Sequence, residues 1–302
     1  MKVVPLVLLA AGALVSGDTG PALGWSPMVW QSMKMGGKDV PHAALMVEVA
    51  VDGLPSPALM QLDTGAVNWV YRAPKDAPWW RGEYEVALTG TAAGRKFHDE
   101  WFRRREDPRA VADGKPVVGT LGAPFFENRV LILDFAGSRL AILDALPREV
   151  ERRAAFTPLE YRNNKMFVTF TANGKEETQM FFDSGSSLLA MVTTRARWIE
   201  MTGRQPNDSR NEHWNVNSWG NTVRMVGAPM KGQMCFGRAC IPNPLMFFEP
   251  SGLRNLDFDR YGYKASGLFG NVAFDGRVTV IVDVPRRRFG LIAGSLGNLI
   301  PR

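Results

Sequence analysis

Two stretches of the chain share one pattern of hydrophobic and polar positions. Residues 44–66 read ALMVEVAVDGLPSPALMQLDTGA, and residues 165–187 read KMFVTFTANGKEETQMFFDSGSS. Each starts with large apolar residues at every second position (45, 47, 49 and 51; 166, 168 and 170), continues through Asp-Gly or Asn-Gly, and ends in a second apolar run. Alternation is typical of a half-buried strand, and both dipeptides favour tight hairpin turns. Both stretches therefore predict a β-hairpin whose second strand runs into the triplet Asp-[Thr/Ser]-Gly.

A second repeated block follows each hairpin. Residues 119–143 read GTLGAPFFENRVLILDFAGSRLAIL, and residues 267–292 read GLFGNVAFDGRVTVIVDVPRRRFGLI. In both, a glycine-containing turn precedes an apolar strand that ends in an aspartate, Asp134 or Asp283, and another apolar strand closes the block. Chance repetition of turns would not keep the order and spacing of two separate blocks. The sequence therefore predicts an internal duplication that gives two homologous lobes.

The repeats predict an all-β fold with a signal peptide over residues 1–24, an N-terminal lobe over residues 25–150 and a C-terminal lobe over residues 151–302. The polar stretch 146–153 contains a proline and joins the lobes, either as a linker or as a short helix. Helical periodicity is scarce elsewhere, and residues 193–201 are the best candidate for a short helix.

The N-terminus has the three parts of a secretory signal peptide. One lysine precedes about a dozen mostly apolar residues, and small residues follow them. The apolar run is shorter than the roughly 20 residues that cross a bilayer, although a single-helix anchor is the alternative. We expect cleavage after Gly17 or Gly24, export to the periplasm or the medium, and no stable membrane insertion of the mature chain.

Export would place the chain where disulfides persist. The chain has two cysteines, Cys235 and Cys240, with Gly237 between them for a bend. We expect a disulfide that closes a small ring at a hairpin tip and contributes about 2 kcal/mol. Two thiols without neighbouring ligands bind metals poorly, and the three histidines lie far apart in the sequence. The sequence therefore predicts neither a metal nor a cofactor.

The charge balance is moderately basic. The chain has 36 Lys+Arg against 30 Asp+Glu, which gives a formal net charge of +6. The basic residues lie in short, scattered clusters such as residues 103–105 and 286–288, without interleaved aromatic residues or a known nucleic-acid motif. Such clusters are typical of solvated faces, and we expect no nucleic-acid partner.

Asp63 and Asp183 occupy equivalent positions in the two hairpins, at the ends of apolar strands. An unpaired carboxylate there would cost several kcal/mol. A pseudo-twofold axis between the lobes would bring the two together, where ionised carboxylates about 3 Å apart repel by roughly 5 kcal/mol at an effective dielectric near 20. The pair would then share one proton. Its ionised member could take a proton from water while the protonated member polarises a carbonyl group.

The residues beside the aspartates fit this scheme. Gly65 and Gly185 would let the backbone pass close to the carboxylates and bring amide groups near them. The hydroxyl groups of Thr64 and Ser184 could bond the backbone of the opposite lobe and lock the dyad. Ser186 could orient the carboxylate or simply form the turn.

The chain resembles the pepsin-type, two-lobed aspartic endopeptidases. Their signature is an Asp-[Thr/Ser]-Gly-[Ser/Thr/Ala] turn in each lobe, here residues 63–66 and 183–186, with a hydrophobic-hydrophobic-Gly segment behind it, here ending in Gly122 and Gly270. The resemblance implies two β-barrel-like lobes with the active site at their interface. It also implies a monomeric, exported endopeptidase that acts on a peptide or protein. The alternative is a catalytically inactive relative that binds peptides or a cell-envelope partner in the same cleft.

The chain departs from the pepsin pattern at several points. The aspartates are 120 positions apart (183 − 63), which requires trimmed loops. Ala66 replaces the usual serine, as in retroviral-type relatives, and suggests a less acidic optimum. We expect no propeptide and therefore no zymogen step. The hairpin that covers the cleft in this family would lie within residues 83–101, with its tip at residues 92–94. Its aromatic residues Tyr84, Phe97 and Trp101 are candidates for the aromatic side chain that this hairpin carries in the family, but we expect core packing for each of them.

Overall fold

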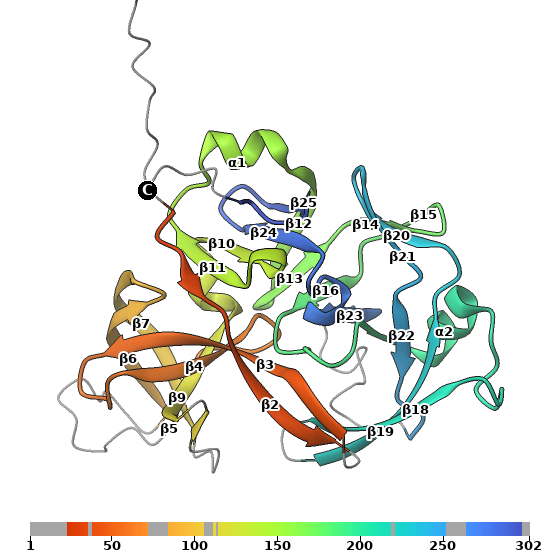
Figure 1. Ribbon diagram of the computed structural model, residues 1–302, viewed down its shortest axis with the longest axis horizontal. Helices are drawn as coiled ribbons and strands as arrows, with labels where there is room; N and C mark the ends of the chain where they lie inside the picture. Colours follow the sequence, from red (N-terminus) through yellow and green to blue (C-terminus); the bar gives the residue numbers. More distant parts are fainter. Residues whose placement is uncertain are drawn as a thin grey trace, which may run out of the picture.

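The computed structural model describes residues 23–35, 38–71, 84–105, 111–112, 114–218, 221–251 and 264–297. The expected signal peptide lies outside the described residues, apart from its last two positions. The fold is all-β and two-lobed. Figure 1 shows two groups of strands side by side, one from each half of the chain, with strands of both halves meeting in a shared sheet above them.

The first lobe contains an eight-stranded sheet in the described part of the chain. Its central strands are buried on every residue or nearly so, because apolar side chains lie on both faces. In spatial order the strands are β2 (Val29–Met35), β3 (Lys38–Val51), β4 (Ala58–Asp63), β9 (Lys115–Gly122), β5 (Trp69–Tyr71), β7 (Arg95–Arg105) and β6 (Glu85–Ala92), with β8 (Val111–Ala112) paired to β9.

The second lobe continues a larger sheet and adds a small one. The strands of the larger sheet in this lobe are β13 (Lys165–Val168), β16 (Met180–Asp183), β23 (Gly267–Gly270), β17 (Met191–Thr193), β22 (Leu245–Phe248), β19 (Asn221–Pro229) and β18 (Glu212–Ser218). The small sheet consists of β15 (Lys175–Glu177), β14 (Phe170–Ala172), β20 (Gln233–Phe236) and β21 (Ala239–Pro242).

Strands from both repeated blocks form the shared sheet. Its order is β1 (Ser26–Pro27), β11 (Arg139–Leu143), β10 (Val130–Asp134), β24 (Val278–Asp283), β25 (Arg288–Ala293) and β12 (Ala155–Arg162). The two middle strands, β10 and β24, are antiparallel equivalents from the two halves, so the pseudo-twofold axis passes between them. The duplicated blocks of the sequence therefore meet here as one continuous sheet.

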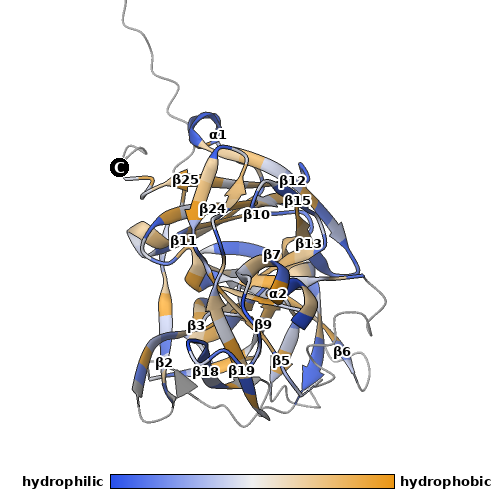
Figure 2. Ribbon diagram, turned by 90° about the vertical axis from the view of Figure 1, so that its right-hand side faces the viewer, coloured by the Kyte–Doolittle hydropathy of each residue, from blue (hydrophilic) through white to orange (hydrophobic). Residues whose placement is uncertain are grey.

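The alternation along β10 explains how the shared sheet is buried on both faces. Leu131 and Leu133 pack into the main core, whereas Val130 and Ile132 pack with Val150 of the short helix α1 (Arg148–Arg153). Successive side chains of a strand point to opposite faces, so this pattern needs cover on both sides. Figure 2 shows α1 as a largely hydrophilic helix above strands that are mostly hydrophobic. The polar stretch between the repeats is thus a short helix.

The expected helix in the second lobe is α2 (Arg195–Thr202). It begins later than predicted because Thr193 still pairs in β17 and the side chain of Thr194 caps the helix by accepting a hydrogen bond from the Arg197 amide. Gly203 ends the helix in the left-handed conformation, with φ of 65°. The helix packs through Trp198, which is fully buried.

The two predicted hairpins differ in the structure. The first is present as β3 and β4, which pair on either side of the Asp52-Gly53 turn. In the second, the Asn173-Gly174 turn is present with both residues at positive φ, but it joins β14 to β15. The strand before the turn is divided at Thr169, whose amide bonds the Pro158 carbonyl oxygen. The piece that carries the turn consequently pairs in the small sheet.

The predicted disulfide is present in that small sheet. Cys235 and Cys240 lie directly opposite each other on β20 and β21, with their Cα atoms 4.0 Å apart. Gly237 in the connecting turn has φ of 57°, a conformation that favours glycine. The bond closes a short ring and stabilises this hairpin locally.

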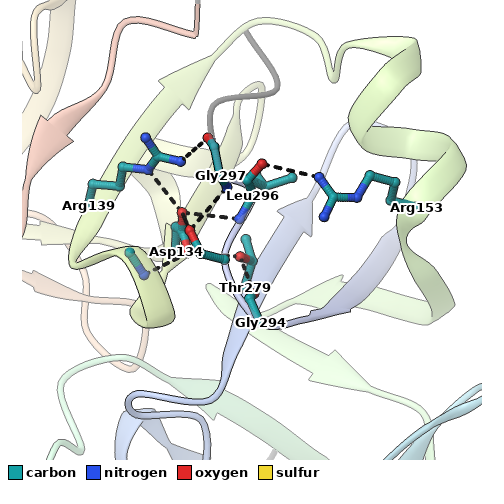
Figure 3. A network of polar contacts seen from close by, with 9 residues as sticks. Asp134, Arg139, Arg153, Thr279, Gly294, Leu296 and Gly297 are labelled. Atoms are coloured by element: carbon teal, nitrogen blue, oxygen red, sulfur yellow. Dashed lines mark hydrogen bonds and ion pairs between the residues drawn. The ribbon is translucent and has the colours of Figure 1, made fainter.

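Asp134 connects the shared sheet to the C-terminal part of the chain. Its fully buried carboxylate accepts hydrogen bonds from the Gly137 amide at 2.9 Å and from Arg139 Nε at 2.9 Å (Figure 3). On its other side it contacts groups of the second half of the chain, namely Thr279 Oγ1 at 3.0 Å, Ser295 Oγ at 2.7 Å and the Leu296 amide at 3.3 Å.

The described part of the chain holds neither a membrane-spanning helix nor a metal-type cluster of side chains. None of its helices is both long and apolar enough to cross a membrane. None of the described histidine, cysteine, aspartate and glutamate side chains gather in threes or more as a metal site would need.

Candidate active site

The same arrangement of strands surrounds Asp63 and Asp183. Asp63 ends β4, which is parallel to β9, and β9 is antiparallel to β5. Asp183 ends β16, which is parallel to β23, and β23 is antiparallel to β17. In each case the aspartate is in register with the last glycine of its neighbour, Gly122 or Gly270. The duplication therefore extends to the strand pairing around both residues.

These two glycines are required by the chain that turns after each aspartate. A Cβ atom on Gly122 would lie 2.3 Å from the backbone carbon of Val67, and one on Gly270 would lie 1.9 Å from the Ser186 carbonyl oxygen. Real Cβ atoms do not approach backbone atoms so closely, so any side chain would displace the turn. The glycines behind the dyad thus allow the aspartate-bearing turns to pack onto the neighbouring strands.

The two aspartates lie against each other across the lobe interface. A Cβ atom on Gly65 would be 2.4 Å from the carboxyl carbon of Asp183, and one on Gly185 would be 2.4 Å from the carboxyl carbon of Asp63. Each carboxyl group therefore rests on the turn glycine of the opposite lobe. Asp63 is 6% exposed and Asp183 is partly buried.

Each carboxylate also accepts a hydrogen bond from its own turn. The Gly65 amide donates to Asp63 Oδ1 at 3.0 Å, and the Gly185 amide donates to Asp183 Oδ1 at 2.9 Å. Hydrogen bonds from backbone amides orient a carboxyl group and favour its ionised form. One oxygen of each aspartate is thus fixed by its turn.

Thr64 and Ser184 bond across the interface in a reciprocal pattern. Thr64 Oγ1 donates to the Phe182 carbonyl oxygen at 2.9 Å and accepts from the Ser184 amide at 2.9 Å. Ser184 Oγ donates to the Leu62 carbonyl oxygen at 3.0 Å and accepts from the Thr64 amide at 2.9 Å. Both side chains are fully buried, so these bonds hold the two aspartate turns together.

We expect Thr64→Val to lower the free energy of unfolding by about 2–4 kcal/mol, because the Phe182 carbonyl and the Ser184 amide would each be buried without a partner. Urea denaturation followed by tryptophan fluorescence measures the change. Thr171→Val, at an exposed position of β14, is the matched control and should stay within about 0.5 kcal/mol. Equal stability of the two variants would contradict the locking role of Thr64.

The environment raises the pKa of both aspartates above the usual value for aspartic acid. Burial is the main cause for each. The Asp183 charge raises the Asp63 pKa further, whereas Lys165 and the hydrogen bond from Asp63 lower that of Asp183. The two carboxyl groups are coupled, so they titrate as a pair and hold one proton between them over an intermediate pH range.

Ser186 contributes through its backbone. Its amide favours the ionised form of Asp183, while its hydroxyl group contacts the Leu189 carbonyl oxygen at 3.3 Å. Of the two roles considered for this serine, the hydroxyl group therefore belongs to the turn.

Sequence reasoning missed two buried asparagines that support the turns. Asn68 Oδ1 accepts a hydrogen bond from the Gly122 amide at 2.9 Å. Asn271 Nδ2 donates to the Ser184 carbonyl oxygen at 2.6 Å. Asn271 directly follows Gly270, and this polar residue beside an apolar strand was the available signal. Sequence reasoning also missed Lys165, which occupies the position of Ala44 in the first repeat.

The hairpin considered as a cleft cover is present as β6 and β7, with Ala93 and Gly94 in its turn. Its tip packs on the lobe's own sheet, because Ala93 is buried and its amide bonds the Glu48 carbonyl oxygen at 3.0 Å. Phe97 lies in the core as expected. The expectation of core packing was wrong for Tyr84 and Trp101, which are 73% and 53% exposed.

Comparisons with known proteins identify no family. No protein-family model matches the chain, and no curated protein matches it. Conglutin gamma, a basic 7S globulin from lupine seeds, is 10% identical with a TM-score of 0.47, over 91% of this chain and 96% of that one. Basic 7S globulin from soybean is 11% identical with a TM-score of 0.47, over 91% and 98%. Functional inference therefore rests on the residues of this chain.

Proposed function

We propose that the protein is an exported aspartic endopeptidase, which hydrolyses peptide bonds with a water molecule activated by Asp63 and Asp183. The observation that carries the proposal is the reciprocal contact of the two carboxyl groups, each resting on the glycine turn of the opposite lobe. Their raised and coupled pKa values support it, because one proton on the pair gives both a base and an acid.

The proposed reaction uses the two members in different roles. The Asp183 carboxylate takes a proton from water as the water oxygen bonds to the peptide carbonyl carbon, while the Asp63 proton moves to the carbonyl oxygen. The resulting diol collapses when its C–N bond breaks: the leaving nitrogen receives the proton held by Asp183, and the Asp63 carboxylate takes a proton from one hydroxyl group of the diol. The products are a carboxyl group and an amine, and the dyad returns to its state with one proton.

The charge state of the pair sets the expected pH dependence. Below the lower apparent pKa of the pair both groups are protonated and the base is lost, and above the higher apparent pKa both are ionised and the acid is lost. Because burial raises both pKa values, both limbs of the bell-shaped profile lie above the usual range of aspartic acid. This direction agrees with the less acidic optimum suggested by Ala66.

A mixed peptide library tests the proposal and its alternative together. The purified mature protein is incubated with the library at several pH values, with and without pepstatin, and products are identified by mass spectrometry. We expect internal cleavage that follows a bell-shaped pH profile and is suppressed by pepstatin. Retention of peptides without cleavage at any pH would instead support a catalytically inactive peptide-binding protein.

A further inference from the structure

Lys165 reaches the dyad from the second lobe. It is the first residue of β13, directly after the exposed turn at Asn163 and Asn164. Its Nζ donates a hydrogen bond to the Gly65 carbonyl oxygen of the first lobe and lies 5.5 Å from the centre of the Phe181 ring. Because Gly65 packs against the Asp183 carboxyl group, this contact brings an ammonium group beside the two aspartates.

The first lobe has no equivalent charge. Lys165 and Ala44 are the first residues of the two repeated hairpins, and the Asn-Gly and Asp-Gly turns follow both at the same spacing. Ala44 pairs with Gln31 and packs beside a small apolar cluster. Among the described residues the dyad is therefore symmetric in its strands and hydrogen bonds but asymmetric at this pair of positions, where the second lobe contributes an ammonium group and the first lobe a methyl group.

Two ionisable side chains of β12, those of Arg162 and Tyr161, lie beside Lys165 in the pairing of β12 with β13. Arg162 lies opposite it in register on β12, but its guanidinium group stacks on Phe167 and bonds Glu160 and Gln179. The neighbouring Tyr161 has its pKa raised to about 12 by burial and by the charge of Glu127, against the opposing charge of Arg287, so it is neutral at physiological pH.

The carboxylates whose charges act on Lys165 are Asp183 and Asp63, in that order. Burial lowers the pKa of Lys165, and these two carboxylates oppose that change. The ammonium group in turn lowers the pKa of both aspartates against the larger effect of their burial. The electrostatic interaction between Lys165 and the two aspartates is therefore reciprocal.

We propose that Lys165 is a positioning residue of the dyad, which bonds the aspartate turn of the opposite lobe and supplies the fixed counter-charge that keeps Asp183 ionised. The catalytic role of Lys165 rests on the proposed function, in which Asp183 is the base and Asp63 carries the proton. The effect of the Lys165 charge on the pKa values of the two aspartates can be measured whether or not the protein cleaves peptides.

The test separates the charge of Lys165 from its hydrogen bond. Lys165→Met removes both, Lys165→Gln keeps a donor without the charge, and Lys165→Arg keeps the charge. Lys175→Met is the matched control, since Lys175 is exposed on β15 and pairs with Glu200. Circular dichroism and thermal unfolding identify which variants are folded, and Lys165→Gln replaces Lys165→Met if the latter is not.

The decisive measurement is the carboxyl ¹³C NMR titration of substrate-free protein labelled at aspartate, with the dyad signals assigned from Asp63→Asn and Asp183→Asn. Without the counter-charge the ionised form is less favourable, so the midpoint of Asp183 should rise by about 1 pH unit in Lys165→Gln and Lys165→Met. Lys165→Arg and Lys175→Met should titrate like the wild type. Unchanged midpoints in the uncharged variants would overturn the proposal.

The same variants distinguish this proposal from the proposed function. If library peptides are cleaved, both limbs of the kcat/KM profile should move to higher pH in Lys165→Gln. Cleavage with an unshifted profile would overturn the role of Lys165 and leave the endopeptidase proposal intact. Shifted NMR midpoints in a protein that cleaves nothing would support the role of Lys165 and refute the endopeptidase proposal.

Discussion

Asp63→Asn and Asp183→Asn should each lower kcat/KM for peptide cleavage by about 10⁴-fold. An amide in place of Asp183 cannot take a proton from water, and an amide in place of Asp63 cannot hold the proton that the pair shares. Both changes nearly preserve the shape of the side chain, so the loss would report on proton transfer. The measurement is the rate of hydrolysis of a peptide selected from the library, taken across the active pH range.

Asp52→Asn is the matched control for these two variants. Asp52 lies in the exposed turn of the first hairpin, and the second hairpin has Asn173 followed by Gly174 at the equivalent turn. The substitution therefore introduces a residue that this turn already accepts, and activity should be unchanged. Cleavage by Asp183→Asn at more than about 1% of the wild-type rate would refute the dyad mechanism. Proton transfer by a positioned side chain alone accelerates a reaction by at least about 100-fold, and that acceleration should be lost.

Asp63→Asn should also increase the free energy of unfolding, by an amount that depends on pH. The pKa of Asp63 is raised in the folded state, so its stabilising contribution is complete at low pH and is lost as the pH rises through the folded-state pKa. Asp63→Asn removes this loss. The difference in melting temperature, variant minus wild type, should therefore grow as the pH rises above the usual value for aspartic acid and level off above the folded-state pKa.

Asp134→Ala should lower the free energy of unfolding by about 3–5 kcal/mol, the range for breaking a buried ion pair by removing one partner. The Arg139 guanidinium group would lose its carboxylate, and the buried groups that now bond Asp134 would lose their acceptor. These groups come from both halves of the chain, so the two-lobed structure as a whole should melt at lower temperature. Urea denaturation and calorimetry measure the effect.

Asp144→Ala is the matched control for Asp134→Ala. Asp144 directly follows β11 in sequence and pairs with Arg95, but its side chain is 67% exposed. Exposed ion pairs contribute about 0–1 kcal/mol, so this variant should remain close to the wild type. A similar decrease in the free energy of unfolding in both variants would show that the buried network around Asp134 stabilises the protein no more than an exposed ion pair does.

Local patterns predicted much of the fold because their causes are local. Asp-Gly and Asn-Gly favour positive φ at a turn, Thr194 and Gly203 begin and end a helix, and the cysteines in CFGRAC are close enough to bridge. The division of the second hairpin at Thr169 was not predictable in this way. It depends on the Pro158 carbonyl oxygen and on pairing with β20, which are tertiary contacts.

Exposure of aromatic residues was the least predictable property. Phe97 and Trp101 lie on the same strand, yet Phe97 is buried beside Phe125 and Trp101 faces solvent. In a regular strand these two residues, four positions apart, would point to the same face. The pairing of β6 and β7 shifts register between Leu88, opposite Glu100, and Gly90, opposite Phe97, and Asp99 has φ of 51°, so an irregularity within β7 turns Trp101 away from the buried face.

By itself, the sequence determined the duplication, the all-β class and the two candidate aspartates, because repeated residues at repeated spacing favour equivalent local structures. The tertiary structure decided how the copies meet. It placed each carboxyl group on the glycine of the opposite turn, crossed the bonds of Thr64 and Ser184, and brought Lys165 to one side alone. Proton sharing and charge asymmetry arise from distances across the lobe interface, and only packing of the two lobes sets those distances.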